Sequence, residues 1–262
     1  MYFAGVDIGS TMTKVVLMDK SSNLLSTIKG PTGPEYRQLA NEVMRQALEQ
    51  ASLQIDDISY IVATGYGRLN VPFADLQITE LSCHARGVSS LFPNVRTAID
   101  IGGQDAKCMK IDNGRLISFV MNDKCAAGTG RFLEVTAATL GIKLEDMGDI
   151  SLKATQKIQI SNLCTIFAQQ EVVALLSRGE KVENILAGLH DALASRVAAL
   201  ARRLGIEPDL VLTGGVAPLL TGALGAAILA KEIYTKAMAA SEALPTTSRR
   251  LEKATFSNSE QR

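Results

Sequence analysis

The chain has 262 residues, enough for one large domain or two smaller lobes with their own hydrophobic cores. Its 27 Lys and Arg residues balance 27 Asp and Glu residues, and only 5% of the side chains are aromatic. Proteins that bind nucleic acid or anionic membranes usually present clustered positive charge, often with aromatic side chains between. We therefore expect no nucleic-acid partner and no membrane partner.

Two further observations bear on location. The first residues contain no basic segment followed by a long apolar one, so we expect no signal peptide. Residues 210–230 carry no charge over the length of a membrane span. Glycines and Pro218 interrupt this stretch, which favours a buried strand, a turn and a buried helix over the alternative of a membrane span. These features predict a cytoplasmic protein.

The first half of the chain contains the same pattern twice. An apolar strand ends in a glycine turn with an acidic residue, and a second strand follows. The first copy comprises Tyr2–Val6, Asp7–Thr11 and Lys14–Asp19, and the second comprises Val95–Ile99, Asp100–Asp105 and Ala106–Ile111. The repeat predicts two related lobes, residues 1–94 and 95–240. The tail, 241–262, lacks apolar periodicity and is expected to be disordered.

Helices and strands alternate in the rest of the chain, as expected of an α/β fold. Apolar periodicity predicts helices at 35–51, 80–91, 131–140, 165–177 and 182–204. It predicts strands at 58–63, 116–121, 158–160 and 209–212.

The two glycine turns have the composition of a phosphate-binding site. Glycine lets backbone N–H groups approach a phosphate closely, which favours Gly9, Gly102 and Gly103 as contacts. Hydroxyl and ammonium donors follow in Ser10, Thr11 and Lys14. Asp7 and Asp105 are suited to holding Mg²⁺ through water or to orienting the attacking water, and Gln104 is a third catalytic candidate. A single turn of this type is also ordinary hairpin punctuation, but two such turns together with Thr213–Gly215 favour a nucleotide site.

This combination resembles the actin-like ATPases, which include sugar kinases and heat-shock chaperones. The resemblance implies two ribonuclease-H-like lobes with ATP and Mg²⁺ between them. It implies phosphate loops at Asp7–Lys14 and Asp100–Asp105, and an adenosine turn at Thr213–Ala217 that includes Gly214 and Gly215. Gly222–Ala226 would begin a connecting helix. Walker and Rossmann motifs do not occur in their strand–helix context, so those ATP folds are poor alternatives.

Two of the four cysteines precede predicted helices. Cys125 lies before a glycine-rich turn, and Cys164 lies directly before the helix at 165–177. A helix N-terminus favours the thiolate, so these residues suit metal ligands, although buried inert thiols fit the same positions. A [4Fe–4S] cluster takes four thiolates, and a twofold dimer would supply them. Cys83 and Cys108 are interpreted as core thiols.

Four motifs, at 63–68, 80–85, 100–105 and 122–132, resemble the ATP-dependent activators of 2-hydroxyacyl-CoA dehydratases. That family also includes ATPase subunits of benzoyl-CoA reductases. The resemblance implies that Cys125 and Cys164 ligate one [4Fe–4S] cluster per homodimer, and that Gly128, Thr129 and Gly130 belong to the cofactor-binding turn. It further implies a ferredoxin or flavodoxin as electron donor, and an iron–sulfur acyl-CoA dehydratase or reductase as partner. ATP hydrolysis would drive one low-potential electron into that partner.

The sequence departs from the family at one place. Only Pro218–Thr221 stand where the family has a helix and a strand, so either an edge element is lost or the sequence omits a segment. This departure leaves other functions open. The alternatives are a benzoyl-CoA-type reductase subunit, a small-molecule kinase with Asp105 as its base and no cluster, and a regulatory protein that binds ATP without turnover.

Overall fold

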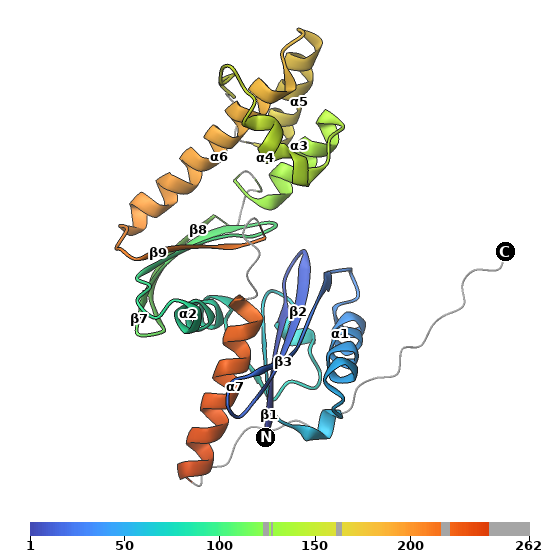
Figure 1. Ribbon diagram of the computed structural model, residues 1–262, viewed down its shortest axis with the longest axis vertical. Helices are drawn as coiled ribbons and strands as arrows, with labels where there is room; N and C mark the ends of the chain where they lie inside the picture. Colours follow the sequence, from blue (N-terminus) through green and yellow to red (C-terminus); the bar gives the residue numbers. More distant parts are fainter. Residues whose placement is uncertain (123–125, 127, 161–163, 216–220, 241–262) are drawn as a thin grey trace, which may run out of the picture. The chain divides into compact units, whose positions relative to one another are not determined.

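The computed structural model describes residues 1–122, 126, 128–160, 164–215 and 221–240. The chain forms two compact units (Figure 1). Of the described residues, the first comprises 1–93, 113–116 and 221–240, and the second comprises 94–112 and those between 117 and 215. Each unit combines one β-sheet with helices, so the α/β class predicted from the sequence is confirmed.

The first unit has a five-stranded sheet in the order β3-β2-β1-β4-β5. Its strands are β1 (Tyr2–Ile8), β2 (Met12–Asp19), β3 (Leu24–Pro31), β4 (Ile58–Thr64) and β5 (Leu76–Gln77). β1 to β3 form an antiparallel meander, and β4 joins β1 in parallel. The predicted first hairpin is therefore confirmed, and the strand that ends at Ile8 lies in the middle of the sheet.

Helices cover both faces of this sheet. α1 (Tyr36–Ala51) packs on one face, where Val43 and Met44 meet Val6 and Ile61 in the core. α2 (Glu80–Leu91) and α7 (Thr221–Ala240) pack on the other face, as Figure 1 shows for α1 and α7. The apolar side chains of the strands alternate between the two cores, as their period of two requires.

α7 belongs to the first unit by its contacts. Ala227 and Ala230 are buried against strand residues of the first sheet, and Glu232 pairs with Arg86 of α2. The Nζ of Lys231 donates to the Oγ of Ser22 at 2.7 Å. The sequence-based division assigns 221–240 to the second lobe, whereas these contacts join the helix to the first sheet. A helix packs where its apolar face can be buried, and the apolar face of α7 is buried against the first sheet.

The second unit contains a four-stranded sheet in the order β8-β7-β6-β9. Its strands are β6 (Thr97–Ile101), β7 (Ala106–Asp112), β8 (Arg115–Asn122) and β9 (Leu210–Gly214). β6 pairs antiparallel with β7 and parallel with β9, as β1 does with β2 and β4. The described residues contain no counterpart of β5 in this sheet, so β9 is an edge strand there.

The described residues of the second unit also form the α-helices α3 (Gly130–Leu140), α4 (Met147–Ser151), α5 (Thr165–Ser177) and α6 (Val182–Leu204). The carboxyl-terminal half of α6 packs on the sheet through Val197 and Leu200. Its amino-terminal half forms a separate core with α3, α4 and α5 around Phe132 and Leu186. One long helix thus connects the sheet to the helical core (Figure 1).

The strand predicted at Ile158–Ile160 is wrong, because these residues form no strand. The N–H of Ile158 instead donates to the carbonyl of Asn184 on α6, at 3.3 Å. An added Cβ on Gly188 would lie 1.7 Å from the Ile158 carbonyl oxygen, so the segment runs directly over α6. The segment has no neighbouring strand among the described residues, so it packs on α6 instead, and Ile160 is buried there.

The five predicted helices and the remaining predicted strands are confirmed, while β3, β5 and α4 are additions that the sequence pattern did not indicate. Residues 210–230 contain β9 and the start of α7. Among the described residues, no helix has the length and apolarity needed to cross a membrane. The expected disordered tail at 241–262 and the short connection at 218–220 lie outside the described residues.

Candidate functional site

The first glycine turn ends β1. The β1–β2 register places Asp7 opposite Lys14, and the Nζ of Lys14 lies 3.1 Å from the Oδ2 of Asp7. The N–H of Gly9 donates to the Met12 carbonyl at 3.1 Å, and a Cβ on Gly9 would lie 2.7 Å from that oxygen. Only glycine therefore fits this tight turn without displacement. The turn presents Ser10 and Thr11, both partly exposed, beside a fixed aspartate.

A glycine turn at Gly65–Gly67, which the sequence analysis did not assign to the site, also lies against Asp7. Gly65 follows β4 with a left-handed φ of 85°. A Cβ at this position would lie 2.4 Å from the Oδ1 of Asp7 and 2.5 Å from the carbonyl oxygen of Ile8. The N–H of Gly67 donates to the same Ile8 carbonyl at 2.8 Å. The motif at 63–68 was visible in the sequence, but only the parallel pairing of β1 with β4 brings it to Asp7.

The second glycine turn of the repeat ends β6 in the second unit. The N–H of Gly102 donates to the Asp105 carbonyl at 2.9 Å, and a Cβ on Gly102 would lie 2.7 Å from the Oδ1 of Asp105. The Nζ of Lys107 lies 3.0 Å from that Oδ1 and 3.6 Å from the Oδ2 of Asp100. Gln104 is exposed in the turn. Lys107, which the sequence analysis did not consider, thus contacts both aspartates of the turn.

The end of β9 lies beside this turn. The register pairs Asp100 with Thr213 and Ile101 with Gly214. The hydroxyl of Thr213 donates to the Oδ1 of Asp100 at 3.1 Å. Gly214 has a φ of 107°, and a Cβ there would lie 2.2 Å from the Ile101 carbonyl oxygen, so glycine is required at this position. Apart from its chain neighbours, no described atom lies within 4 Å of a Cβ added to Gly215. The two predicted nucleotide-binding segments of this unit therefore meet at one sheet edge.

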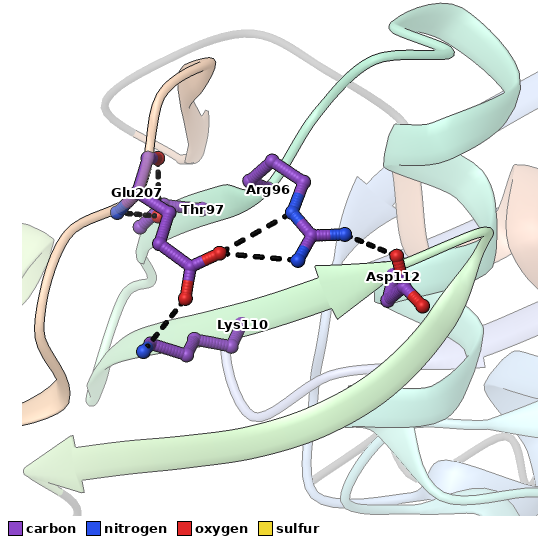
Figure 2. Close-up of polar contacts among 5 residues, drawn as sticks. All are labelled: Arg96, Thr97, Lys110, Asp112 and Glu207. Carbon is purple, nitrogen blue, oxygen red and sulfur yellow. Dashed lines mark hydrogen bonds and ion pairs between the residues drawn. The ribbon is translucent and has the colours of Figure 1, made fainter.

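A group of charged side chains holds the start of β9 against the other end of β6 (Figure 2). The carboxylate of Glu207 accepts from Arg96 at 3.1 Å and from Lys110 at 2.9 Å, and Arg96 also pairs with Asp112. The Thr97 hydroxyl donates to the Glu207 carbonyl at 2.7 Å. Hydrogen bonds from Lys110 and Arg96 lower the pKa of Glu207 below its ordinary value. This network fixes β9 in register with β6.

The start of α3 is hydrogen-bonded to the second turn. The N–H of Gly130 donates to the Gly102 carbonyl, and the N–H of Arg131 donates to the Gly103 carbonyl, both at 2.8 Å. A Cβ on Gly130 would lie 3.3 Å from the Gly102 oxygen, so the helix begins in close contact with the turn. The first N–H groups of a helix have no partner within the helix. Here the carbonyls of the candidate phosphate loop satisfy two of them.

The turn that precedes α3 is tightly closed. Thr129 is fully buried, and its hydroxyl donates to the Ala126 carbonyl at 2.6 Å. Gly128 has a left-handed φ of 90° and lies against the side chain of Arg196 on α6. Cys125 itself lies outside the described residues. The hydroxyl of Thr129 therefore faces its own turn, whereas Gly130 lies against the second turn, and contact of either residue with a cofactor stays a prediction.

Cys164 is the N-cap residue of α5 and is exposed. Its carbonyl accepts the Ala168 N–H at 2.8 Å, while its side chain forms no capping hydrogen bond. The hydroxyl of Thr165 is buried without a hydrogen-bond partner among the described residues. An exposed thiol at the positive end of a helix, beside an unsatisfied donor, fits a thiolate ligand of a metal centre.

Cys83 and Cys108 differ from Cys164 in environment. Burial raises the pKa of Cys83 to about 12 and that of Cys108 to about 11, so both remain neutral thiols in the core. This agrees with their interpretation as core residues. Burial also lowers the pKa of His190, whose Nδ1 lies 3.0 Å from the Ser151 hydroxyl. These three side chains are structural by their surroundings. Whether the candidate residues bind ATP, Mg²⁺ or a cluster stays a prediction.

Comparison with known proteins gives consistent relationships. The model of the BadF/BadG/BcrA/BcrD ATPase family matches residues 4–244. The 2-hydroxyisocaproyl-CoA dehydratase activator of Clostridioides difficile is 44% identical over 258 residues, covering 88% of this chain and 95% of the activator. A benzoyl-CoA reductase subunit of Thauera aromatica is 34% identical over 220 residues, covering 82% of this chain and 78% of that protein.

A solved structure agrees with the sequence relationships. The activator of the 2-hydroxyisocaproyl-CoA dehydratase from Clostridium difficile with bound ADPNP superimposes with a TM-score of 0.84 at 40% identity, covering 93% of this chain and 99% of the activator. This likeness extends over both units and shows that the fold is that of the actin-like ATPases. The chain belongs to the BadF/BadG/BcrA/BcrD ATPase family.

Proposed function

We propose that this protein is an ATP-hydrolysing activator that drives low-potential one-electron transfer to a partner 2-hydroxyacyl-CoA dehydratase. The observation that carries this proposal is the direct hydrogen bonding of the second glycine turn to α3, since that helix follows the Cys125 segment. A 44% identical relative is itself a dehydratase activator, and a solved relative contains bound ADPNP. We also propose a cytoplasmic location for it.

ATP would be bound by the two glycine turns. Gly9, Gly102 and Gly103 have no Cβ, so the turns can approach the phosphates closely, and Ser10, Thr11 and Lys14 add donors from the first turn. Gly214 and Gly215 would contact the adenosine. Such a set of donors positions the phosphates and stabilises the charge that develops during transfer.

Hydrolysis requires an oriented water and a divalent cation. Asp7 and Asp105 would hold Mg²⁺ through water or orient the attacking water, with Gln104 as a further polar contact. The water oxygen bonds to the γ-phosphorus as the bond to the β–γ bridging oxygen breaks, which leaves ADP and phosphate. Asp7 is suited to this task because Gly65 and Lys14 hold its carboxylate in one position.

A [4Fe–4S] cluster, bound by Cys125 and Cys164 of two protomers, would supply the one-electron carrier. Cys164 fits this role, since it is exposed at a helix start and the neighbouring Thr165 has a buried hydroxyl that no described residue satisfies. On the same helix Ile166, Phe167 and Val173 are exposed. Exposed apolar side chains near a shared site support a homodimer through α5.

The nucleotide state would reach the Cys125 segment through backbone contacts. Gly102 and Gly103 accept hydrogen bonds from the first two residues of α3, so a shift of the turn moves the helix. Contacts that differ between the ATP and ADP states would then bias the protein between two arrangements. A ferredoxin or flavodoxin is the proposed electron donor.

A second candidate is the ATPase subunit of a benzoyl-CoA-type reductase. The match to the benzoyl-CoA reductase of Thauera aromatica favours it, but at 34% identity against 44% for the dehydratase activator. A small-molecule kinase without a cluster, with Asp105 as base, is favoured by the fold alone. The exposed Cys164 at the start of α5 argues for the activator instead.

The deciding experiment measures iron, acid-labile sulfide and ATP hydrolysis on protein purified without oxygen. The proposal expects about four iron and four sulfide per dimer, as one shared [4Fe–4S] cluster requires, together with Mg²⁺-dependent ATPase activity. Absence of iron after anaerobic reconstitution would exclude the electron-transfer function. Electron delivery to a purified dehydratase or to a benzoyl-CoA-type reductase then separates the two partners.

A further inference from the structure

The two glycine-turn hairpins share a cross-strand ion pair. In the first hairpin Lys14 on β2 directly opposes Asp7 on β1, and in the second Lys107 on β7 directly opposes Asp100 on β6. Each lysine contacts the aspartate that it faces, Lys14 at 3.1 Å and Lys107 at 3.6 Å. In each hairpin, therefore, a lysine on the second strand lies opposite the aspartate on the first strand.

The two lysines differ in what surrounds them. The side chain of Lys14 is 27% exposed, whereas that of Lys107 is 4% exposed. The ammonium group of Lys107 contacts a second carboxylate, the Oδ1 of Asp105, at 3.0 Å. A buried ammonium that is held by two protein carboxylates is poorly placed to bind a phosphate as well, while the partly exposed ammonium of Lys14, which pairs with Asp7, remains accessible to one. The lysine at this position of the repeat is therefore suited to phosphate binding in the first hairpin and to holding carboxylates in the second.

The ammonium group of Lys107 holds the carboxylate of Asp105 by an ion pair. That aspartate closes the turn, since its carbonyl accepts the Gly102 N–H at 2.9 Å, and its side chain is 27% exposed. Asp100 and Asp105 both contact the one ammonium, so without it two carboxylates would face each other in a partly buried site. Like charges so placed repel each other, and Asp105, the more exposed of the two, would turn away.

We propose that Lys107 is a positioning residue: it fixes the carboxylate of Asp105 in the second glycine turn and does not itself bind the nucleotide. This inference rests on the proposed function, in which Asp105 orients the attacking water or holds Mg²⁺ through water. Positioning of such a group matters because small displacements reduce the rate of a phosphoryl transfer that depends on geometry.

The test compares Lys107→Met with Lys14→Met in the full-length protein, with turnover of MgATP and binding of a fluorescent ATP analogue as readouts. For Lys107→Met we expect kcat to fall about tenfold or more while the Kd of the analogue stays within about threefold. For Lys14→Met we expect the Kd to rise about tenfold or more, since a direct phosphate donor is lost. An unchanged kcat in Lys107→Met, or a loss confined to binding, would overturn the inference.

A double-mutant cycle with Asp105→Asn shows whether Lys107 acts through Asp105. In that background Lys107→Met should reduce kcat little further, because the group that it positions is already lost. Full additivity of the two effects would contradict the positioning role. If Lys107→Met does not fold, Asp100→Asn/Lys107→Met removes the buried pair together, and its kcat should still be low. No turnover by the wild-type protein would overturn the proposed function, and the role of Lys107 with it.

Discussion

Gly65 lies directly against Asp7. A single added carbon at Gly65 would come within 2.4 Å of the Oδ1 of the aspartate, and within 2.5 Å of the Ile8 carbonyl oxygen. The two residues are far apart in the sequence, and the parallel pairing of β1 with β4 brings them together. The carboxylate is thereby confined between a glycine turn and Lys14, which is the arrangement that a catalytic group requires.

Substitution of Gly65 by alanine should therefore impair catalysis. The left-handed backbone and the short contacts require Asp7 or the turn to move, at a cost on the order of 1–3 kcal/mol in stability. We expect ATP turnover to fall about tenfold or more, as for loss of an oriented catalytic group. Gly33→Ala is the matched control, because nothing lies within 4 Å of a Cβ at Gly33. Equal turnover in the two variants would show that the position of Asp7 does not matter.

The contact between the second turn and α3 leads to a prediction for Gly130→Ala. Unlike Gly65→Ala, this substitution should not lower the stability of the protein. Alanine at Gly130, the first residue of α3, should stabilise the fold by about 0.4–1 kcal/mol, because alanine has fewer conformations than glycine in the unfolded chain. Its Cβ would also press on Gly102 and Gly103 at 3.3 and 3.4 Å. We expect an unchanged or higher Tm together with a several-fold lower rate of ATP hydrolysis.

The control for Gly130→Ala is Gly148→Ala in α4, where nothing lies within 4 Å of the new carbon. Both variants add a methyl group to a helix of the same unit. Thermal melting and steady-state ATPase assays on the two variants separate helix propensity from displacement of the turn. Parallel behaviour of the pair in both assays would mean that the α3 contact does not influence the nucleotide site.

The Glu207 network predicts a pH dependence of stability. Lys110 and Arg96 lower the pKa of Glu207 in the folded protein, so its ionised form favours folding. This contribution is complete above the ordinary pKa of 4.5 and is lost as the pH falls through the lower folded value. Relative to the wild type, Glu207→Gln should therefore be less stable at neutral pH, with the difference shrinking below pH 4.5.

Urea unfolding at a series of pH values measures this difference. Glu145→Gln is a suitable control, since Glu145 is exposed and forms no ion pair with any residue that the structure describes. A constant difference between wild type and Glu207→Gln across the acid range would mean that the network contributes nothing through the charge of Glu207. High salt should also reduce the effect at neutral pH, because the charges of the network are solvent-exposed.

Replacement of Cys164 by serine should remove the iron and leave nucleotide binding intact. Cys164 begins α5, whereas the candidate nucleotide contacts lie at the ends of β1, β6 and β9. Iron content and binding of an ATP analogue are measured on the same preparation. Cys108→Ala is the control, because burial keeps that thiol neutral and it should retain full iron content. Full iron in Cys164→Ser would refute the ligand assignment.

The sequence was sufficient to predict the two hairpins, because each is local. An apolar strand, a glycine turn and a second strand are recognisable over some twenty residues, and the occurrence of two such turns together with Thr213–Gly215 favours a nucleotide site. The helices that follow Gly130 and Cys164 were predicted for the same reason, since their periodicity lies within the segment itself. The motifs also sufficed to indicate the family.

Tertiary structure decided what depends on pairing between distant segments. Gly65 reaches Asp7 only because β4 joins β1, and Lys107 joins Asp100 to Asp105 only through the register of β6 with β7. The apolar run at Ile158–Ile160 has the composition of a strand, but a strand needs a neighbour, and α6 is what it meets. α7 likewise packs on the first sheet, because its apolar face is buried there. Local sequence determines an element, whereas the partner of each element depends on which surfaces remain to be buried in the whole chain.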